Sequence, residues 1–186
     1  MFRPRITTQV RLVRASAPAA AALAGALVLT ACSNSGSEEK NYTVPKSLCG
    51  VPSDRELLDP FLPGGDSITV KSSSLNGGTK QCDVMIDGDV AVREIQTWWS
   101  DGESTATVAK GYDKTDDGQL TDDGQYLYAG TGGVGRTAAS CKSAKHPDQD
   151  LYGVIQIFTP DREDSDAMKD LIISYAKALE NSSSCR

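Results

Sequence analysis

The most regular pattern of apolar and polar positions lies near the C-terminal end of the chain. Apolar side chains recur there at intervals of three and four residues, the spacing of one face of an α-helix. Asp164-Ser165-Asp166 precedes this pattern, and negative charge favours a helix N-terminus. We therefore predict a terminal helix whose buried side is formed by Met168, Leu171, Ile172, Tyr175 and Leu179.

Short apolar segments separated by turn residues predict strands in the middle of the chain. Residues 82–86 and 90–93 flank Asp87-Gly88, the strongest short hairpin signal here, and the second strand is expected to continue toward Trp99. Residues 151–158 (LYGVIQIF) are apolar at successive positions, which is typical of a central strand buried on both faces. Further strands are expected at residues 68–70, 126–129 and 134–141.

Two shorter helices complete the pattern. Ser53 and Glu56 have the spacing of a capping box, and apolar residues follow them. Residues 104–112 predict one or two helical turns. Because hairpin links imply antiparallel pairing, the predicted fold class is α+β, with a single antiparallel β-sheet flanked by N- and C-terminal helices.

The N-terminal segment has the features of an export signal. Its basic head holds four arginines and no acid, and residues 15–31 are uncharged and mostly apolar. This run is short for a membrane span, which needs ~20 apolar residues, but it fits a signal peptide over residues 1–31. The stretch Leu29-Thr30-Ala31-Cys32 resembles a bacterial lipobox, which implies that Cys32 is diacylated and becomes the first mature residue. The alternative is an ordinary signal peptide with a chance cysteine.

The remaining chain divides into a tether and one domain. Residues 32–47 are small and polar, so we expect a lipidated flexible tether. Residues 48–186 have the length of one globular α+β domain. Removal of four arginines with the signal leaves 15 basic and 25 acidic residues, a net charge of −10. Phosphate backbones repel such a protein, so nucleic acid is not an expected partner.

Cysteine usage agrees with export. Besides Cys32 there are four cysteines, an even number, and an oxidising compartment permits disulfides. Three pairings are open, and we expect the sequential one, Cys49–Cys82 and Cys141–Cys185. In the chain-entropy model each bridge stabilises the fold by ~4 kcal/mol. A four-cysteine zinc site is not expected, because closely spaced pairs are absent.

The string GTGGVG at residues 130–135 has the glycine spacing of a dinucleotide-binding loop. Asp150 nevertheless precedes the second strand, where the ribose-binding acid would follow it, and the segment after the glycines lacks large apolar side chains. We therefore interpret these glycines as a hairpin turn that uses positive φ angles, and we expect no cofactor.

Two other polar segments invite a functional interpretation. Residues 113–120 mimic the first positions of an EF-hand loop, but Gly124 stands where a bidentate carboxylate is required. We expect a solvated loop and no metal site; a weak, distorted calcium site is the alternative. His146 is the only histidine and is expected to be a solvated loop residue.

The adjacent tryptophans Trp98 and Trp99 are the candidate ligand-binding residues. On a strand they face opposite sides, so one enters the core. The other is either covered by residues 104–112 or a helix end, or lines a groove for a ligand or partner. Catalytic signatures are missing: the chain has no G-x-S-x-G elbow and no histidine cluster. A carboxylate pair remains the one enzymatic option, as in glycan hydrolysis.

The lipobox, the stretch beginning Leu48-Cys49-Gly50, Cys82 in an early strand and a last helix ending near Cys185 resemble uncharacterised actinobacterial secreted lipoproteins built on a domain of unknown function. The layout also resembles the Mog1/PsbP group, which implies a helix-flanked antiparallel sheet. We expect a lipoprotein held by palmitate-like chains on the extracytoplasmic face of the cell membrane. Its expected role is a non-catalytic module that binds an envelope protein, lipid or glycan; the alternative is an extracytoplasmic enzyme using two carboxylates.

Overall fold

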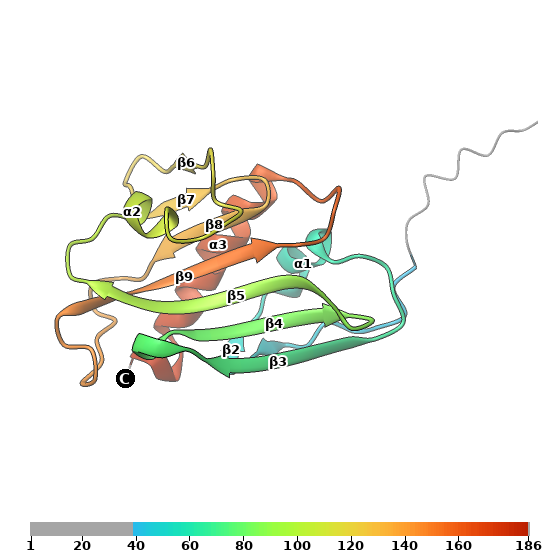
Figure 1. Ribbon diagram of the computed structural model, residues 1–186, viewed down its shortest axis with the longest axis horizontal. Helices are drawn as coiled ribbons and strands as arrows, with labels where there is room; N and C mark the ends of the chain where they lie inside the picture. Colours follow the sequence, from blue (N-terminus) through green and yellow to red (C-terminus); the bar gives the residue numbers. More distant parts are fainter. Residues whose placement is uncertain (1–38, 186) are drawn as a thin grey trace, which may run out of the picture. The chain divides into compact units, whose positions relative to one another are not determined.

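A seven-stranded antiparallel sheet organises the domain in the computed structural model, which describes residues 39–185 (Figure 1). Its spatial order is β3-β4-β5-β9-β8-β7-β6, and every neighbouring pair is antiparallel. A separate two-stranded sheet precedes it, so the predicted α+β class is confirmed but the expectation of a single sheet is wrong. The strands are β1 (Ser47–Leu48), β2 (Val51–Pro52), β3 (Ile68–Ser74), β4 (Lys80–Ile86), β5 (Asp89–Ser100), β6 (Gln119–Leu120), β7 (Tyr126–Tyr128), β8 (Gly132–Arg136) and β9 (Gln149–Ile157).

Strand β9 lies in the middle of the sheet and is buried on both faces, as its continuous apolar run predicts. Leu151, Ile155 and Ile157 belong to one core, whereas Tyr152 and Val154 belong to a second, smaller core on the opposite face. The alternation of strand side chains thus divides one apolar segment between two packing layers.

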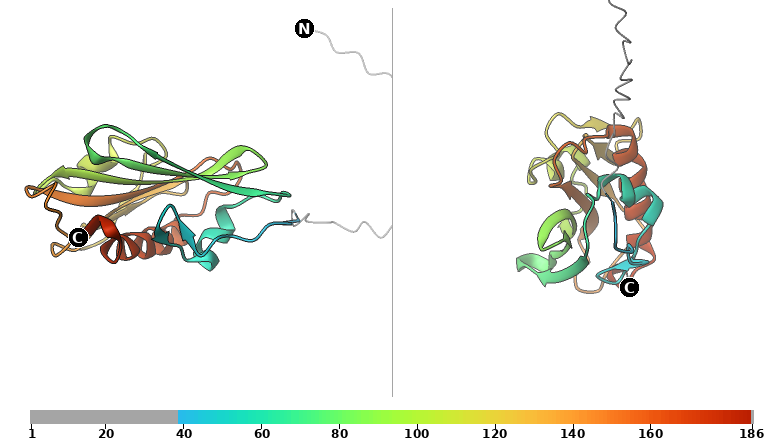
Figure 2. Two further views of the ribbon diagram at one scale, coloured as in Figure 1. Left: turned by 90° about the horizontal axis from the view of Figure 1, so that it is seen from below. Right: turned by 90° about the vertical axis from the view of Figure 1, so that its right-hand side faces the viewer.

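The two faces of the sheet are covered unequally. On the inner face lie helix α3 (Ser165–Glu180), helix α1 (Arg55–Leu58) with the 3₁₀ turn η1 (Asp59–Phe61), and the β1–β2 hairpin (Figure 2). On the outer face the short helix α2 (Thr105–Ala109) covers β7 and β8. The outer side of β3 and β4 has no such cover, and most residues of β3 are exposed.

Local signals in the sequence place most of these elements correctly. Helix α3 buries the predicted stripe and is capped by Asp164, whose carboxylate accepts from the Ala167 N–H. The Asp87-Gly88 hairpin is confirmed, with φ angles of 51° and 98°. Helix α1 begins one residue later than predicted, because Asp54 and not Ser53 accepts the free N–H groups of its first turn.

The glycine string at residues 130–135 forms a hairpin, but our explanation of the glycines is wrong. The Ala129 N–H donates to the Gly132 carbonyl across the turn, and β8 follows antiparallel to β7, so no helix opens after the glycines. None of these glycines has a positive φ angle. Gly133 is instead required by packing, since an added Cβ would lie 3.0 Å from the Ile172 Cβ on α3.

The same requirement recurs beside Gly133. An added Cβ at Gly135 would lie 3.0 Å from the Ala176 Cβ, and at Gly153 of β9 it would lie 2.9 Å from side-chain atoms of Tyr175 and Leu179. Glycine at these positions therefore lets α3 approach the backbone of β8 and β9 directly.

The packed domain includes residues that composition assigns to the tether. The Asn41 N–H donates to the Gly65 carbonyl, the Gly65 N–H donates to the Glu39 carbonyl, and Val44 is buried in the main core. Residues 39–47 thus belong to the domain, which differs from the predicted boundary at residue 48. The signal peptide, Cys32 and the first tether residues lie outside the described residues.

Substitution of Gly133 tests the close contact with α3. We expect Gly133→Ala to destabilise the domain by about 1–3 kcal/mol, because the new methyl group overpacks against Ile172. Ile172→Ala alone should cost about 2–5 kcal/mol through cavity formation. In the double variant the two costs should fall short of their sum by about 1 kcal/mol or more, measured by urea unfolding. Strict additivity would contradict the contact.

Candidate functional site

The two disulfides connect Cys49 to Cys82 and Cys141 to Cys185, which confirms the sequential pairing. The first links the β1–β2 turn to the inner face of β4. The second links the loop between β8 and β9 to the 3₁₀ turn η3 (Ser183–Cys185) that follows α3. Cys32 lies outside the described residues, so its acylation stays a prediction.

Trp98 and Trp99 lie near the end of β5 and face opposite sides of the sheet. Trp99 packs against the smaller core, and Gly111, just after α2, lies against its ring, as predicted for a tryptophan covered by residues 104–112. Trp98 is on the inner face beyond the end of the main core and is half-buried. Of the two, Trp98 is the one that lines an open hollow.

This hollow, which we call the Trp98 groove, has a volume of about 330 Å³. Four segments that are separate in the sequence form it: the 3₁₀ turn η2 (Asn76–Gly78) with the start of β4, the end of β5 with Trp98, residues 143–146, and η3. The side chains that matter for its chemistry are Lys80, Trp98, Ser143, Lys145, His146 and Ser184.

His146 forms one wall of the groove by stacking on Trp98. The two ring centroids are 4.6 Å apart and the planes differ by 8°. The His146 Nδ1 lies 2.7 Å from the Gln149 Oε1, and this hydrogen bond fixes the orientation of the imidazole. Gly78 is needed here as well, since an added Cβ would lie 2.6 Å from the His146 Cε1. His146 is thus a loop residue, as expected, but it is half-buried and held against Trp98 instead of being fully solvated.

The lining of the Trp98 groove is basic and hydroxylic. Lys80 and Lys145 contribute two positive charges, and none of the described residues that line the hollow is acidic. Among residues 39–185 neither lysine has a carboxylate within 4.0 Å; Lys80 Nζ donates only to the Ser184 Oγ, at 3.3 Å. The two lysines therefore make the groove locally positive in a protein that has an excess of acidic residues.

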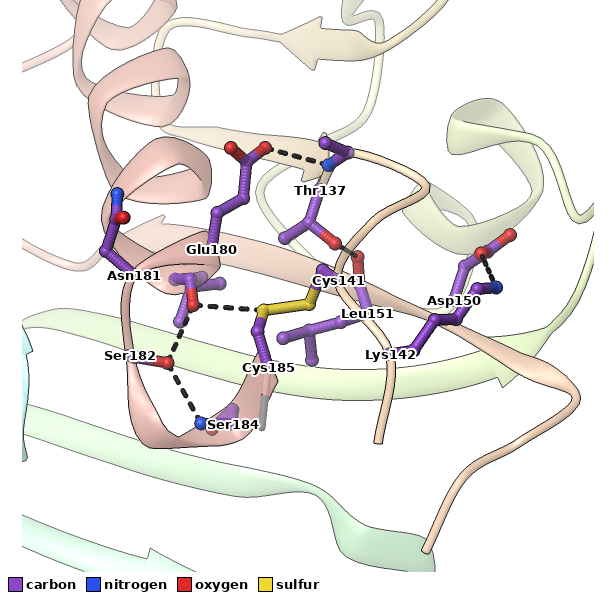
Figure 3. The surroundings of a disulfide bond; sticks show 12 residues. Thr137, Cys141, Lys142, Asp150, Leu151, Glu180, Asn181, Ser182, Ser184 and Cys185 are labelled. Carbon is purple, nitrogen blue, oxygen red and sulfur yellow. Dashed lines mark hydrogen bonds and ion pairs between the residues drawn. A yellow bond between two sulfur atoms is a disulfide. The ribbon is translucent and has the colours of Figure 1, made fainter. Parts of the chain in front are cut away.

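The Cys141–Cys185 disulfide holds two walls of the groove together (Figure 3). Residues 143–146 follow Cys141 directly, and Ser183 and Ser184 precede Cys185. Nearby, the Thr137 hydroxyl donates to the Leu151 carbonyl at 2.9 Å, and the Ala138 N–H donates to the Glu180 carboxylate at 2.7 Å (Figure 3). These bonds fix the beginning of the loop on β9 and α3.

A buried polar cluster lies behind the groove, between β5 and α3. Ser184 Oγ donates to the Gln96 Oε1 at 2.6 Å, and Gln96 in turn interacts with the Tyr175 hydroxyl. Glu94, two residues before Gln96 on the same face, is only 4% exposed. Loss of hydration on burial raises the pKa of Glu94 to about 8, and burial beside Glu94 raises the pKa of Tyr175 well above its usual value.

A larger hollow of about 530 Å³ lies on the uncovered outer face, where its Arg93 and Gln156 side chains are already paired. Arg93 donates through Nε to the Asp83 Oδ1 at 2.6 Å, and its guanidinium lies 5.1 Å from the centre of the Phe158 ring. The Gln156 side-chain amide donates to the Asp113 carbonyl. These contacts account for Arg93 and Gln156 as parts of the sheet surface.

The other buried carboxylate, Asp150, is paired with cations. Burial acts to raise its pKa, but hydrogen bonds from the Arg136 guanidinium and the Gly102 N–H outweigh this and lower it. Lys142 lies 3.4 Å away (Figure 3). In the register of β5 and β9, Asp150 lies opposite Trp99 and so shares its outer face, whereas Glu94 faces α3. The two buried carboxylates of the described chain therefore lie on opposite faces of the sheet.

The acidic loop differs from an EF-hand in how Thr115 is used. The Thr115 hydroxyl, at a position where an EF-hand supplies a ligand, is buried and donates to the Ala109 and Tyr112 carbonyls. Asp123 caps its own turn by accepting from Thr121 and the Gln125 N–H. Within residues 39–185 no three His, Cys, Asp or Glu side chains are grouped as metal ligands.

The chain matches no protein-family model, no curated protein sequence and no solved structure. Over the described residues, no helix has both the length and the apolar character needed to cross a bilayer. Lys80, Lys145 and the three serines of the groove were missed by sequence reasoning. Only the proximity of Ser143 and Ser184 to the paired cysteines could have indicated that their segments meet.

Removal of the second disulfide should open the Trp98 groove. We expect Cys141→Ser/Cys185→Ser and the control Cys49→Ser/Cys82→Ser each to destabilise the fold by about 2–5 kcal/mol. Only the former should separate His146 from Trp98, since only that bridge borders the groove. The imidazole NMR signals of the single histidine report this at native temperature. Equal shifts in both variants, or none in the first, would contradict the assigned role of the bridge.

The raised pKa of Glu94 predicts a specific dependence of stability on pH. Between about pH 4.5 and pH 8 the unfolded chain has lost the Glu94 proton while the folded protein retains it, so deprotonation favours unfolding as pH rises. Through this group the free energy of unfolding should fall by roughly 1.4 kcal/mol per pH unit across that window.

Glu94→Gln should remove this contribution, because glutamine resembles the protonated acid in shape and carries no titrating proton. Denaturant unfolding at several pH values measures the difference from wild type. The exposed Glu56→Gln variant serves as the control and should retain the decline. An unchanged slope in Glu94→Gln would refute the assignment.

Proposed function

We propose that this protein is a lipid-anchored module on the extracytoplasmic face of the membrane that binds an envelope ligand through the Trp98 groove without catalysing a reaction. The observation that carries the proposal is the groove itself. An aromatic pair, two lysines free of carboxylate partners within the described chain and several hydroxyl groups converge on one hollow from four separate segments.

The anchor and the disulfides support the proposed location. The segment before Cys32 resembles a lipoprotein signal, and two acyl chains hold a protein firmly at a bilayer. The two disulfides agree with an oxidising compartment. The acidic excess of the mature chain would not favour an anionic lipid surface, so the lipid on Cys32 supplies the attachment.

The arrangement of acids favours binding over carboxylate catalysis. A glycosidase needs two carboxyl groups on either side of one bond, roughly 5–9.5 Å apart. Glu94 and Asp150 lie on opposite faces of the sheet, and Asp150 is engaged by Arg136. The acidic pair required by the alternative therefore has no counterpart among the buried carboxylates of the described residues.

Photocrosslinking on intact cells tests the proposal directly. A photoreactive amino acid at Ser143, in the groove, should yield adducts with an envelope component, whereas the same group at exposed Ser73 on β3 should not. Adducts are separated by electrophoresis and identified by mass spectrometry. Identical adducts from both positions, or none from Ser143, would contradict a ligand site in the groove.

The anchor is tested in parallel with Cys32→Ser. This variant should lack the acyl mass and leave the membrane fraction, because the attachment depends on the lipid. If Cys32→Ser remains with the membrane as wild type does, the lipid-anchor part of the proposal fails while the result at Ser143 still stands.

A further inference from the structure

We infer that the Trp98 groove is a site for an acidic saccharide, a sugar unit that carries one phosphate or carboxylate group. The inference rests on the proposed function, since it names the ligand class of the same site. Its physical basis is the pairing of a cationic rim with a half-buried aromatic ring and hydroxyl groups in one small hollow.

The cationic part of the site is built from both sides of the groove. Lys80 is on β4 and Lys145 is in the loop between β8 and β9, so a ligand lying between them meets positive charge from two directions. Within residues 39–185 the lining contains no acid that would neutralise this charge. Hydrogen bonds between lysine and a phosphate or carboxylate are charge-assisted and about twice as strong as neutral ones.

The rest of the lining suits a sugar better than a bare anion. Trp98 offers an aromatic surface, and Ser143 and Ser183 offer hydroxyls that can both donate and accept. Ser184 donates its proton to Gln96, so its hydroxyl is left as an acceptor. The Gln96 amide holds Ser184 at 2.6 Å, which positions one of these hydroxyls. A volume of about 330 Å³ lies at the lower end of the range for small-ligand sites, roughly 300–1,000 Å³.

The position of the groove favours a ligand from the envelope over a lipid headgroup. Residue 39, through which the domain joins its N-terminal segment, is hydrogen-bonded beside Gly65, just before β3, whereas Gly78 of the groove follows the far end of β3 (Figure 1). The seven residues of β3 span about 23 Å at ~3.3 Å per residue. The groove and the connection to the anchor are thus at opposite ends of the domain.

Calorimetric titration of the full-length protein in a non-ionic detergent tests the inference. The probes are glucose 6-phosphate, glucuronate, glucose, inorganic phosphate and glycerol 3-phosphate. We expect glucose 6-phosphate or glucuronate to bind, and glucose, phosphate and glycerol 3-phosphate each to bind at least about tenfold more weakly, because each lacks one half of the recognised chemistry. Binding should weaken as salt screens the lysines.

Charge-removing variants localise the binding. Lys80→Gln and Lys145→Gln should each weaken it by about tenfold, the factor expected for one charge-assisted hydrogen bond. Lys71→Gln/Lys110→Gln, which removes two exposed lysines outside the groove, should bind as wild type does. The NMR signals of His146, the only histidine, should shift on binding in wild type and in this control variant.

The outcomes separate this inference from the proposed function. If glucose binds as tightly as its phosphate, the anionic requirement is wrong; if glycerol 3-phosphate binds equally well, the saccharide requirement is wrong. No binding of any probe at millimolar concentration overturns the inference, while adducts from Ser143 on cells would still support a ligand site. If Lys80→Gln/Lys145→Gln still binds glucose 6-phosphate more tightly than glucose, the phosphate group is recognised outside the groove.

Discussion

The close contact between α3 and the glycines of β8 and β9 determines how the rest of the domain is arranged. A Cβ added at Gly133, Gly135 or Gly153 would lie only 2.9–3.0 Å from atoms of α3 residues. The absence of a side chain at these positions therefore lets the helix pack close to the strand backbone. Gly153 pairs with Gln96 on β5, and Tyr175 and Leu179 pack over Gly153. The C-terminal end of α3 is thereby directed toward β5, which brings Ser184 within hydrogen-bonding distance of Gln96.

The groove is a consequence of this geometry and of the second disulfide. The segments that form it have few large apolar residues of their own, and burial alone would stabilise them weakly. The disulfide between Cys141 and Cys185 supplies the missing stabilisation, because it lowers the entropy of the unfolded chain. The disulfide, the Ser184–Gln96 hydrogen bond and the His146 ring stacked on Trp98 fix the segments that line the groove, and the hydrogen bond to Ser184 orients the Lys80 ammonium group.

Sequence patterns predict the parts of the fold that depend on neighbouring residues. The stripe on α3, the Asp87-Gly88 hairpin and the doubly buried β9 follow from periodicity and turn chemistry. The cysteine count predicts two bridges but leaves three pairings open, of which the expected sequential one is observed. Close approach between distant segments leaves no such signature. The packing role of Gly133 depends on Ile172, and the position of His146 depends on Gly78 and Trp98, so neither could be derived from local spacing.

The charge of the whole chain restricts which anions can reach the groove. The net charge of −6 produces a repulsive field that extends over about one Debye length, ~8 Å at physiological salt. A long, densely charged polymer brings many negative groups within that distance at once and is repelled, whereas a ligand with a single acidic group experiences mainly the two nearby lysines. The acidic surface and the basic groove together therefore select for small or sparsely charged ligands, and this selection needs no contact beyond the groove itself.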